Sequence, residues 1–337
     1  MKKQKSIVLF FILWLITVTG CSLNPLSDLE SNEVEQSVSV DSDLIIVGFS
    51  QLGSESDWRT ANTKSIQNAL SKENGFSLIF ANGRQRQENQ IKDIRSFIFQ
   101  EVDYIVIAPV TESGWDTVLE EAKEARIPVI IVDRRIDTEY KNLYVASVET
   151  DKYEEGRKAG LWLEQQCKDD SEQINIVVLE GTLNSTSQIG RSKGFEEIAQ
   201  QHENWNIIAH ESGDFTKAKG KEVMAKFLQE YDDIDVLISQ NDDMTFGAIE
   251  AIKEAGLTCG VNGEITIISF DAVSEAFDKM EEGLINVDIE CNPLQGELIA
   301  QIIDKLEKGE TVDKVSYVKG EVFEAENAKL DRVGRSY

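Results

Sequence analysis

The amino-acid sequence predicts an α/β fold with two doubly wound, parallel-sheet lobes. Short apolar runs bounded by turn residues alternate with segments of helical periodicity, and the connections between them are short. Such runs are typical of strands buried on both faces, as in parallel sheets that helices cover on both sides. The alternation begins at Leu44, pauses near Val145 and then restarts, so two similar halves follow each other in 337 residues. This length suits two domains of ordinary size.

Each half contains several strand and helix candidates in alternation. In the first half we expect strands at 44–49, 77–80, 104–108, 129–132 and, shorter, 143–145, and helices at 57–72, 86–100 and 115–125. In the second half we expect strands at 174–179, 207–209, 236–239, 266–270 and 285–290, with strand-like pieces over 311–323. The expected helices there are 153–167, 188–201, 217–229, 243–255, 274–281 and 294–308.

The N-terminal residues have the pattern of an export signal. Three lysines precede a continuous apolar run at 7–18, and Gly20-Cys21 follows it. This is typical of a secretory signal peptide over residues 1–20, and the run is too short to span a bilayer comfortably. A Cys directly after Gly resembles a bacterial lipobox, which would make Cys21 the lipidated first residue; an ordinary signal with an incidental Cys is the alternative. Residues 21–42 are polar, acidic and aperiodic, which predicts a flexible tether.

The strongly acidic charge excludes some partners. The formal net charge is −27, and removal of the three lysines in residues 1–20 would bring it to −30. A body of this charge repels phosphate backbones and anionic lipid surfaces. We therefore expect no nucleic-acid partner, and membrane attachment only through a lipid anchor.

The remaining cysteines are Cys167, Cys259 and Cys291, and no pair has metal-type spacing. A Cys259–Cys291 disulfide is conceivable in an oxidising compartment. Buried free thiols are the interpretation that we slightly prefer.

Polar residues recur where the expected strands end, which predicts a binding site at the sheet edges. In parallel sheets, ligands gather at the carboxyl ends of the strands. The segment after the first strand combines the flat ring of Trp58 with hydrogen-bonding side chains, as suits a small polyhydroxylated ligand. The candidates in this segment are Ser50, Glu55, Ser56, Asp57, Trp58 and Arg59.

Further candidates follow later strands or lie in turns beside them. They are Asp133, Arg134, Arg191, Phe215, Asn241, Asp271 and Glu290. Asp133 and Arg134 could form a structural ion pair, but we favour ligand contact because guanidinium and carboxylate groups match vicinal hydroxyls. Trp58 could belong to the core, but we favour a stacking platform for a sugar. Asn241 is favoured as a ligand contact, whereas Asp243 is expected to cap a helix.

Catalytic patterns are missing from the sequence. His202 and His210 lie in a polar stretch without a nearby Ser or Cys elbow, and there is no P-loop, dinucleotide-binding glycine pattern or H-E-x-x-H. We therefore expect a protein that is not an enzyme and that has no cofactor and no metal site.

Several segments together resemble one family. SQLGSESDWR, QRQENQIKDIRSF, IAPVTESGW, IPVIIVDRRID, SGDFTKAKGKEVM, NDDMTFGAIEAIKEAGL, SFDA and IECNP are similar to the periplasmic sugar-binding proteins of ABC transporters, of the ribose-binding type. The similarity covers about residues 44–325. Ala108, Glu290 and the GSES insertion before Trp58 depart from the ribose pattern and agree with the galactofuranose-binding type.

The resemblance implies a fold, a site and a function. It implies two lobes joined by a three-strand hinge, with residues 43–147 and 291–322 in the N-terminal lobe and 148–290 and 323–337 in the C-terminal lobe. It places a sugar between the lobes, against the candidates above and Ser147. The implied protein is a component of an ABC importer that binds galactofuranose or another aldose and docks on a permease. With the lipobox described above it is expected to be a lipoprotein, and a monomer is the default for a shuttle component. It would lie on the outer face of the cytoplasmic membrane, or in the periplasm where there is an outer membrane. The alternative is a sensor that presents the sugar to a kinase or chemoreceptor.

Overall fold

The computed structural model describes residues 44–140, 142–167 and 172–337. Residues 43–337 form one compact unit. The signal peptide, Cys21 and the tether lie outside the described residues. Within those residues no helix is long and apolar enough to cross a membrane.

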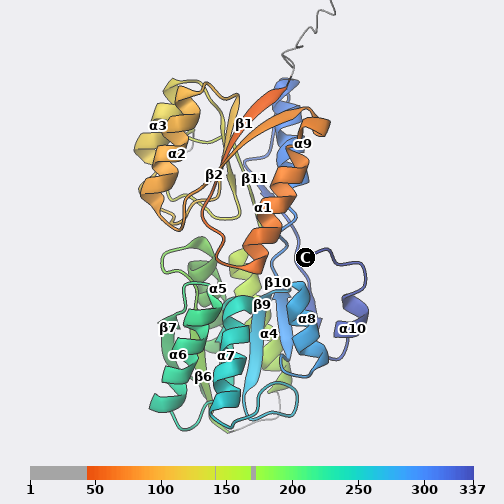
Figure 1. Ribbon diagram of the computed structural model, residues 1–337. Coiled ribbons are helices and arrows are strands. Elements are labelled where there is room, and N and C mark those ends of the chain that lie inside the picture. Colours follow the sequence, from red (N-terminus) through yellow and green to blue (C-terminus); the bar gives the residue numbers. More distant parts are fainter. Residues whose placement is uncertain (1–43, 141, 168–171) are drawn as a thin grey trace, which may run out of the picture. The chain divides into compact units, whose positions relative to one another are not determined.

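Two six-stranded sheets form the framework, as the sequence predicts. The first sheet has the strand order β11-β5-β4-β3-β1-β2, and all its neighbouring strands pair in parallel. Its strands are β1 (Ile45–Gln51), β2 (Phe76–Asn82), β3 (Tyr104–Ile107), β4 (Val129–Val132), β5 (Ala146–Glu149) and β11 (Val315–Tyr317). One face packs against α1 (Asp57–Ala69) and α9 (Gly296–Glu307), and the other against α2 (Gln87–Phe99) and α3 (Asp116–Glu124) (Figure 1). We call this sheet with its helices the first lobe.

The second sheet repeats this plan. Its order is β12-β10-β9-β8-β6-β7, parallel except for the edge strand β12. The strands are β6 (Ile174–Glu180), β7 (Trp205–Ser212), β8 (Val236–Ser239), β9 (Thr266–Asp271), β10 (Val287–Glu290) and β12 (Val322–Glu324). Helices α4 (Lys152–Gln166) and α5 (Thr186–Ala199) cover one face. The helices α6 (Lys217–Glu230), α7 (Asp242–Glu254) and α8 (Ser274–Glu281) cover the other, and α10 (Ala328–Asp331) packs against α8 and β12. This is the second lobe.

The chain passes between the two sheets after β5, after β10 and between β11 and β12. The crossings are tied to one another by backbone hydrogen bonds from Val318 N to Glu149 O (2.8 Å) and from Glu290 N to Glu321 O (2.9 Å). The exact lobe boundaries inferred from the sequence stay predictions.

Some local expectations were wrong. The short strand expected at 143–145 lies instead at β5, Ala146–Glu149, whose four residues are all buried. Its alternating polar residues, Ser147 and Glu149, conceal the strand from a search for apolar runs. Asp243 does not cap α7: the Asn241 side chain does, by accepting from the Met244 N–H at 3.0 Å. Helix α10 had no expected counterpart, because four residues are too few for a periodic pattern.

Candidate functional site

A small cavity lies where elements of both lobes meet. The space between the lining side chains, part of it open to solvent, amounts to about 260 Å³. The lining residues come from the start of α1, the ends of β4 and β9, the first turn of α4 and the first two turns of α5. Others lie in the loop before α6, at the N-cap of α7 and directly after β10. They are Glu55, Ser56, Trp58, Arg59, Asp133, Arg134, Lys152, Ser187, Arg191, Phe215, Asn241, Asp271 and Cys291.

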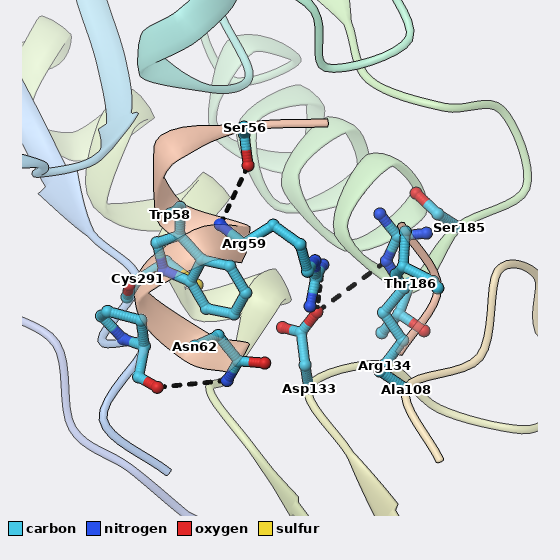
Figure 2. A network of polar contacts seen from close by, with 12 residues as sticks. Ser56, Trp58, Arg59, Asn62, Ala108, Asp133, Arg134, Ser185, Thr186 and Cys291 are labelled. Atoms are coloured by element: carbon cyan, nitrogen blue, oxygen red, sulfur yellow. Dashed lines mark hydrogen bonds and ion pairs between the residues drawn. The ribbon is translucent and has the colours of Figure 1, made fainter. Parts of the chain in front are cut away.

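In the first lobe, Arg59 connects two carboxylates. Its Nε lies 3.1 Å from Glu55 Oε1 and its Nη2 lies 2.7 Å from Asp133 Oδ2, as Figure 2 shows for the second of these. Ser56 begins α1 as its N-cap and accepts from the Arg59 N–H at 3.1 Å. The cap fixes the start of the helix, so successive residues of one turn bring the Trp58 ring and the Arg59 guanidinium to the cavity.

Two aromatic rings, one from each lobe, border the cavity. Trp58 is 3% exposed, and its Nε1–H donates to the carbonyl oxygen of Cys291, which lies just after β10. The Arg59 guanidinium lies 4.6 Å from the centre of the Trp58 ring. On the other side, the Arg134 guanidinium lies 5.5 Å from the centre of the Phe215 ring. Aromatic faces of this kind pack well against the C–H groups of a sugar ring.

In the second lobe, Arg191 has the role that Arg59 has in the first. Its Nε lies 2.9 Å from Glu155 Oε2, and its Nη2 lies 2.9 Å from Asp271 Oδ1. A third contact goes from Nη1 to the backbone oxygen of Gln240. Asn241, besides capping α7, donates to the Phe215 backbone oxygen at 3.4 Å. Both lobes therefore present an arginine that is held between two carboxyl groups.

Burial and neighbouring charges shift the pKa values of these groups. Burial by itself would raise the pKa of Asp133, but three cationic neighbours outweigh it and hold that pKa well below its usual range. In order of effect these neighbours are Lys152, Arg59 and Arg134. Burial, with Arg59 nearby, lowers the pKa of Arg134 to about 10. Burial raises the pKa of Asp271 to about 8, although Arg191 opposes the shift.

Four buried polar atoms of the cavity have no hydrogen-bond partner among the described residues. They are Glu55 Oε2, Arg59 Nη1, Arg134 Nε and Asp133 Oδ1, the last of which lies in an ion pair 3.2 Å from Lys152 Nζ. Unpaired buried polar atoms are unfavourable, because water has been removed and nothing replaces it. Two acceptors and two donors beside two aromatic rings match a ligand whose hydroxyls both donate and accept.

Ten of the fourteen residues expected from the sequence line the cavity, and four do not. The Ser50 hydroxyl donates to Asp93 Oδ2 at 2.8 Å, and the Asp57 backbone N–H donates to Asp243 Oδ2 at 3.2 Å. Ser147 bonds the backbone oxygen of Lys314 at 3.4 Å. The Glu290 carboxylate accepts from Arg335 and from the Tyr337 hydroxyl. The ligand role of all fourteen stays a prediction.

Sequence reasoning missed Lys152, Ser187 and Cys291. Lys152 and Ser187 lie in the first turns of α4 and α5, where polar residues are common and carry no special signal. Cys291 was noted only for its thiol. It is 1% exposed, and burial raises the pKa of that thiol to about 12. Cys259 and Cys291 do not form the disulfide considered above.

The two histidines lie away from the cavity. His202 stacks on Trp205 with ring centres 4.3 Å apart, and His210 Nδ1 lies 3.7 Å from Glu180 Oε1. Within the part of the chain that the structure describes, no group of three or more His, Cys, Asp or Glu side chains could hold a metal ion.

Comparisons with known proteins agree on one family. A family model described as a periplasmic binding protein domain matches residues 47–311. The chain is 41% identical to the galactofuranose-binding protein YtfQ of Escherichia coli over 85% of this chain and 89% of that protein. It is also similar to a solved Mycobacterium smegmatis protein in complex with β-D-fucofuranose, with 43% identity, a TM-score of 0.82, and 85% and 93% of the two chains covered. A Shewanella arabinose-transporter binding protein bound to L-arabinofuranose has 42% identity and a TM-score of 0.81, with 85% and 94% covered.

Proposed function

Since the chain belongs to the periplasmic binding protein family, we propose that it is the solute-binding component of an ABC importer for a furanose sugar. The protein binds sugar outside the cytoplasm and is not an enzyme, as its relatives are non-enzymatic sugar-binding proteins. The observation that carries the finer proposal is that two aromatic rings border one small cavity beside buried donors and acceptors that have no hydrogen-bond partner among the described residues.

In this proposal the two lobes hold different parts of the sugar. Trp58 and Phe215 cover its apolar faces, while the two arginine–carboxylate sets bond its hydroxyls. Asp133 is ionised, so its carboxylate accepts hydrogen bonds that the sugar hydroxyls donate. Asp271, with its raised pKa, also has a proton to donate.

Capture depends on both lobes reaching the same ligand. The protein has arrangements with the lobes together and with the lobes apart. A sugar that binds the first more tightly increases its population, by an amount set by the difference between the two affinities. A membrane permease would recognise the lobes in this arrangement. Micromolar affinity, about −8 kcal/mol, suits capture followed by release.

The ligand class proposed is an aldose in its furanose form, such as galactofuranose or arabinofuranose. Support comes from the relatives at 40–43% identity, whose descriptions name galactofuranose, fucofuranose and arabinofuranose. A hexose and a pentose both occur in that set, so the ring form is the property that they share.

Calorimetric titration of residues 43–337 tests this proposal. The protein is unfolded and refolded first, so that copurified sugar is removed. We expect micromolar binding of galactose or arabinose, for which the small furanose fraction is the bound form, and loss of binding in Arg134→Ala. The exposed Arg95→Ala serves as the matched control, because Arg95 pairs with Glu121 on the surface. Absence of heat with every sugar, from folded and empty protein, would refute the assignment.

We further propose that Cys21 is lipidated and that the mature protein is an anchored monomer. In cells, the wild type should fractionate with membranes and Cys21→Ser should appear in the soluble fraction. Equal distribution of both would contradict the anchor. Uptake of labelled sugar is measured in cells with and without the gene. Loss of uptake on deletion of the gene would support import over the sensor alternative.

A further inference from the structure

Two buried carboxyl groups contact the turn that follows strand β9 in the second lobe. Asp242 begins α7, and Asp288 lies in β10, which pairs in parallel with β9 (Figure 1). Both residues are 0% exposed. Asp288 Oδ1 accepts from the Ala272 N–H at 3.0 Å, and Asp242 Oδ2 accepts from the Val273 N–H at 2.9 Å. Two successive backbone N–H groups of one turn are therefore bonded to two different buried carboxyl groups.

The turn has an unfavourable backbone conformation. Asp271, which lines the cavity, has a φ of 109°, and Ala272 has a φ of 58°. Positive φ values are uncommon for residues other than Gly, and they persist only where surrounding contacts fix them. Asp242 and Asp288 supply two such contacts. The Arg335 guanidinium supplies a third, because it donates to the Ala272 carbonyl oxygen at 3.0 Å.

The hydrogen bonds of the two carboxyl groups leave one oxygen without a donor. Asp242 Oδ1 accepts from the Ser269 hydroxyl at 2.6 Å, so both oxygens of Asp242 have a partner. Asp288 Oδ2 has no partner among the described residues. Two neighbouring carboxyl groups that are out of water do not both ionise at neutral pH. One proton between them would give Asp288 Oδ2 the partner that it lacks.

The pKa shifts of the two groups agree with a shared proton. Burial, together with the charge of Asp288 and a hydrogen bond to it, raises the pKa of Asp242 well above its usual range. Burial also raises the pKa of Asp288 to about 6, a shift that Asp242 and Arg335 oppose and the charge of Asp271 increases.

We propose that Asp242 and Asp288 are positioning residues of the sugar site, which share one proton at neutral pH and together fix the 271–273 turn so that the Asp271 carboxyl group lines the cavity; this rests on the proposed sugar-binding function. Neither residue lines the cavity itself, so both act through Asp271. All the contacts of the pair with the turn lie within the second lobe, and they do not depend on how the lobes are arranged.

The shared proton makes the turn sensitive to alkaline pH. An Asp carboxyl in the unfolded chain has a pKa of about 3.9, so the folded state binds the proton more tightly. The stability that the proton contributes is therefore lost as pH rises through the raised pKa of Asp242. Once the proton has left, two buried negative charges repel each other, and opening of the turn to water relieves the repulsion. The Asp271 carboxyl then loses its position 2.9 Å from Arg191 Nη2.

The test compares Asp288→Asn with Asp288→Ala. The Asn amide keeps an oxygen for the Ala272 N–H and supplies a permanent N–H donor toward Asp242 in place of the shared proton. The Ala side chain supplies neither. Asp235→Ala is the matched control, since Asp235 Oδ2 accepts from the Asn175 N–H at 2.6 Å in the same lobe and does not line the cavity.

Sugar affinity is measured by calorimetry, and the free energy of unfolding by urea, for each refolded protein at about pH 7 and about pH 9.5. At pH 7 we expect Asp288→Ala to bind galactose or arabinose about tenfold more weakly than the wild type, and Asp288→Asn and the control to stay within about threefold. From pH 7 to pH 9.5 the wild type should lose about tenfold more affinity, and more stability, than Asp288→Asn. Asp271 titrates in both proteins, so the difference between them reports the shared proton.

Three results would overturn the proposal. Parallel pH curves for the wild type and Asp288→Asn would exclude the shared proton, as would failure of Asp288→Asn to fold. Wild-type affinity in Asp288→Ala would show that Asp271 does not need the pair. If Asp288→Ala does not fold, as judged by circular dichroism, the pH comparison with Asp288→Asn decides alone. A wild type that binds neither sugar would refute the sugar assignment and the positioning role with it, whereas the unfolding curves would still decide whether the pair shares a proton.

Discussion

Asp133 and Asp271 occupy equivalent places in the two lobes, yet their protonation differs. Each ends or directly follows a strand of its sheet, each has a positive φ (65° and 109°), and each contacts an arginine at 2.7–2.9 Å. Nevertheless the pKa of Asp133 is held well below its usual range, and that of Asp271 is raised to about 8.

The two pKa values differ because the two carboxyl groups have different charged neighbours. Asp133 is surrounded by cations, whose combined effect outweighs burial. Asp271 has Arg191 as its main cation and is also near the acidic side chains of Asp242 and Glu155, so burial prevails. The same strand-end position therefore provides an obligatory acceptor in one lobe and a carboxyl that can donate in the other.

The largest difference in stability between equivalent variants is expected when each of the two carboxyl groups is replaced by an amide. Asp133→Asn should lower the free energy of unfolding by about 3–5 kcal/mol, because it leaves buried cations uncompensated. Asp271→Asn should cost about 1 kcal/mol or less at pH 6, because the carboxyl that it replaces is already mostly neutral. Urea unfolding of both variants checks this, and equal losses would contradict the charge assignment.

The pH dependence of stability should separate the wild type from Asp271→Asn. Folding raises the pKa of Asp271 above its unfolded value of about 3.9, so the folded state binds the proton more tightly. This contribution falls as pH rises from about 4 to about 8, by up to about 1.4 kcal/mol per pH unit. Four titratable groups that face Asp271 remain in the variant: Arg191, Asp242, Lys152 and Glu155. Wild-type stability should therefore decline more steeply between pH 6 and pH 8 than that of the variant, and parallel curves would refute the shift.

Two glycines allow a test of whether the Phe215 ring contributes to sugar binding, because a side chain at one of them would displace that ring. A Cβ at Gly181 would lie 1.8 Å from the Phe215 ring, and one at Gly48 would lie 2.4 Å from the Phe97 ring, away from the cavity. Each Ala variant should lose about 1–3 kcal/mol of stability through overpacking. Calorimetry should show weaker sugar binding for Gly181→Ala only. Equal affinity in both variants would mean that the Phe215 ring does not contact the sugar.

The smallest effects are expected at two equivalent helix caps. Ser56 caps α1 and Ser185 caps α5, each by accepting a backbone N–H. Ser56→Ala and Ser185→Ala should each cost about 1 kcal/mol in thermal unfolding. Since Ser56 lines the cavity and Ser185 does not, only the first should also weaken sugar binding. A larger affinity loss for Ser185→Ala would contradict this.

Much of the fold followed from the alternation of apolar runs and helical segments. Two local predictions were wrong. The sequence predicts a strand at 143–145 instead of β5 at Ala146–Glu149, because the buried polar residues Ser147 and Glu149 interrupt the apolar pattern of β5. The cap of α7 was assigned to Asp243, although Asn241 and Asp243 are equally suited by residue type and only backbone geometry distinguishes them.

The sequence by itself determined the two α/β lobes and the residue types at the strand ends, because burial in a parallel sheet and helix formation are encoded in local periodicity. The tertiary structure decided which of those polar side chains meet. Ser50 bonds Asp93, and Glu290 bonds residues near the C-terminus, so neither lines the cavity; their ligand role stays a prediction. Lys152 gave no local signal, and it became visible only when α4 was placed beside the end of β4. The charge state of a buried group depends on neighbours distant in sequence, since Coulomb interactions are strong over a few ångströms where water is excluded.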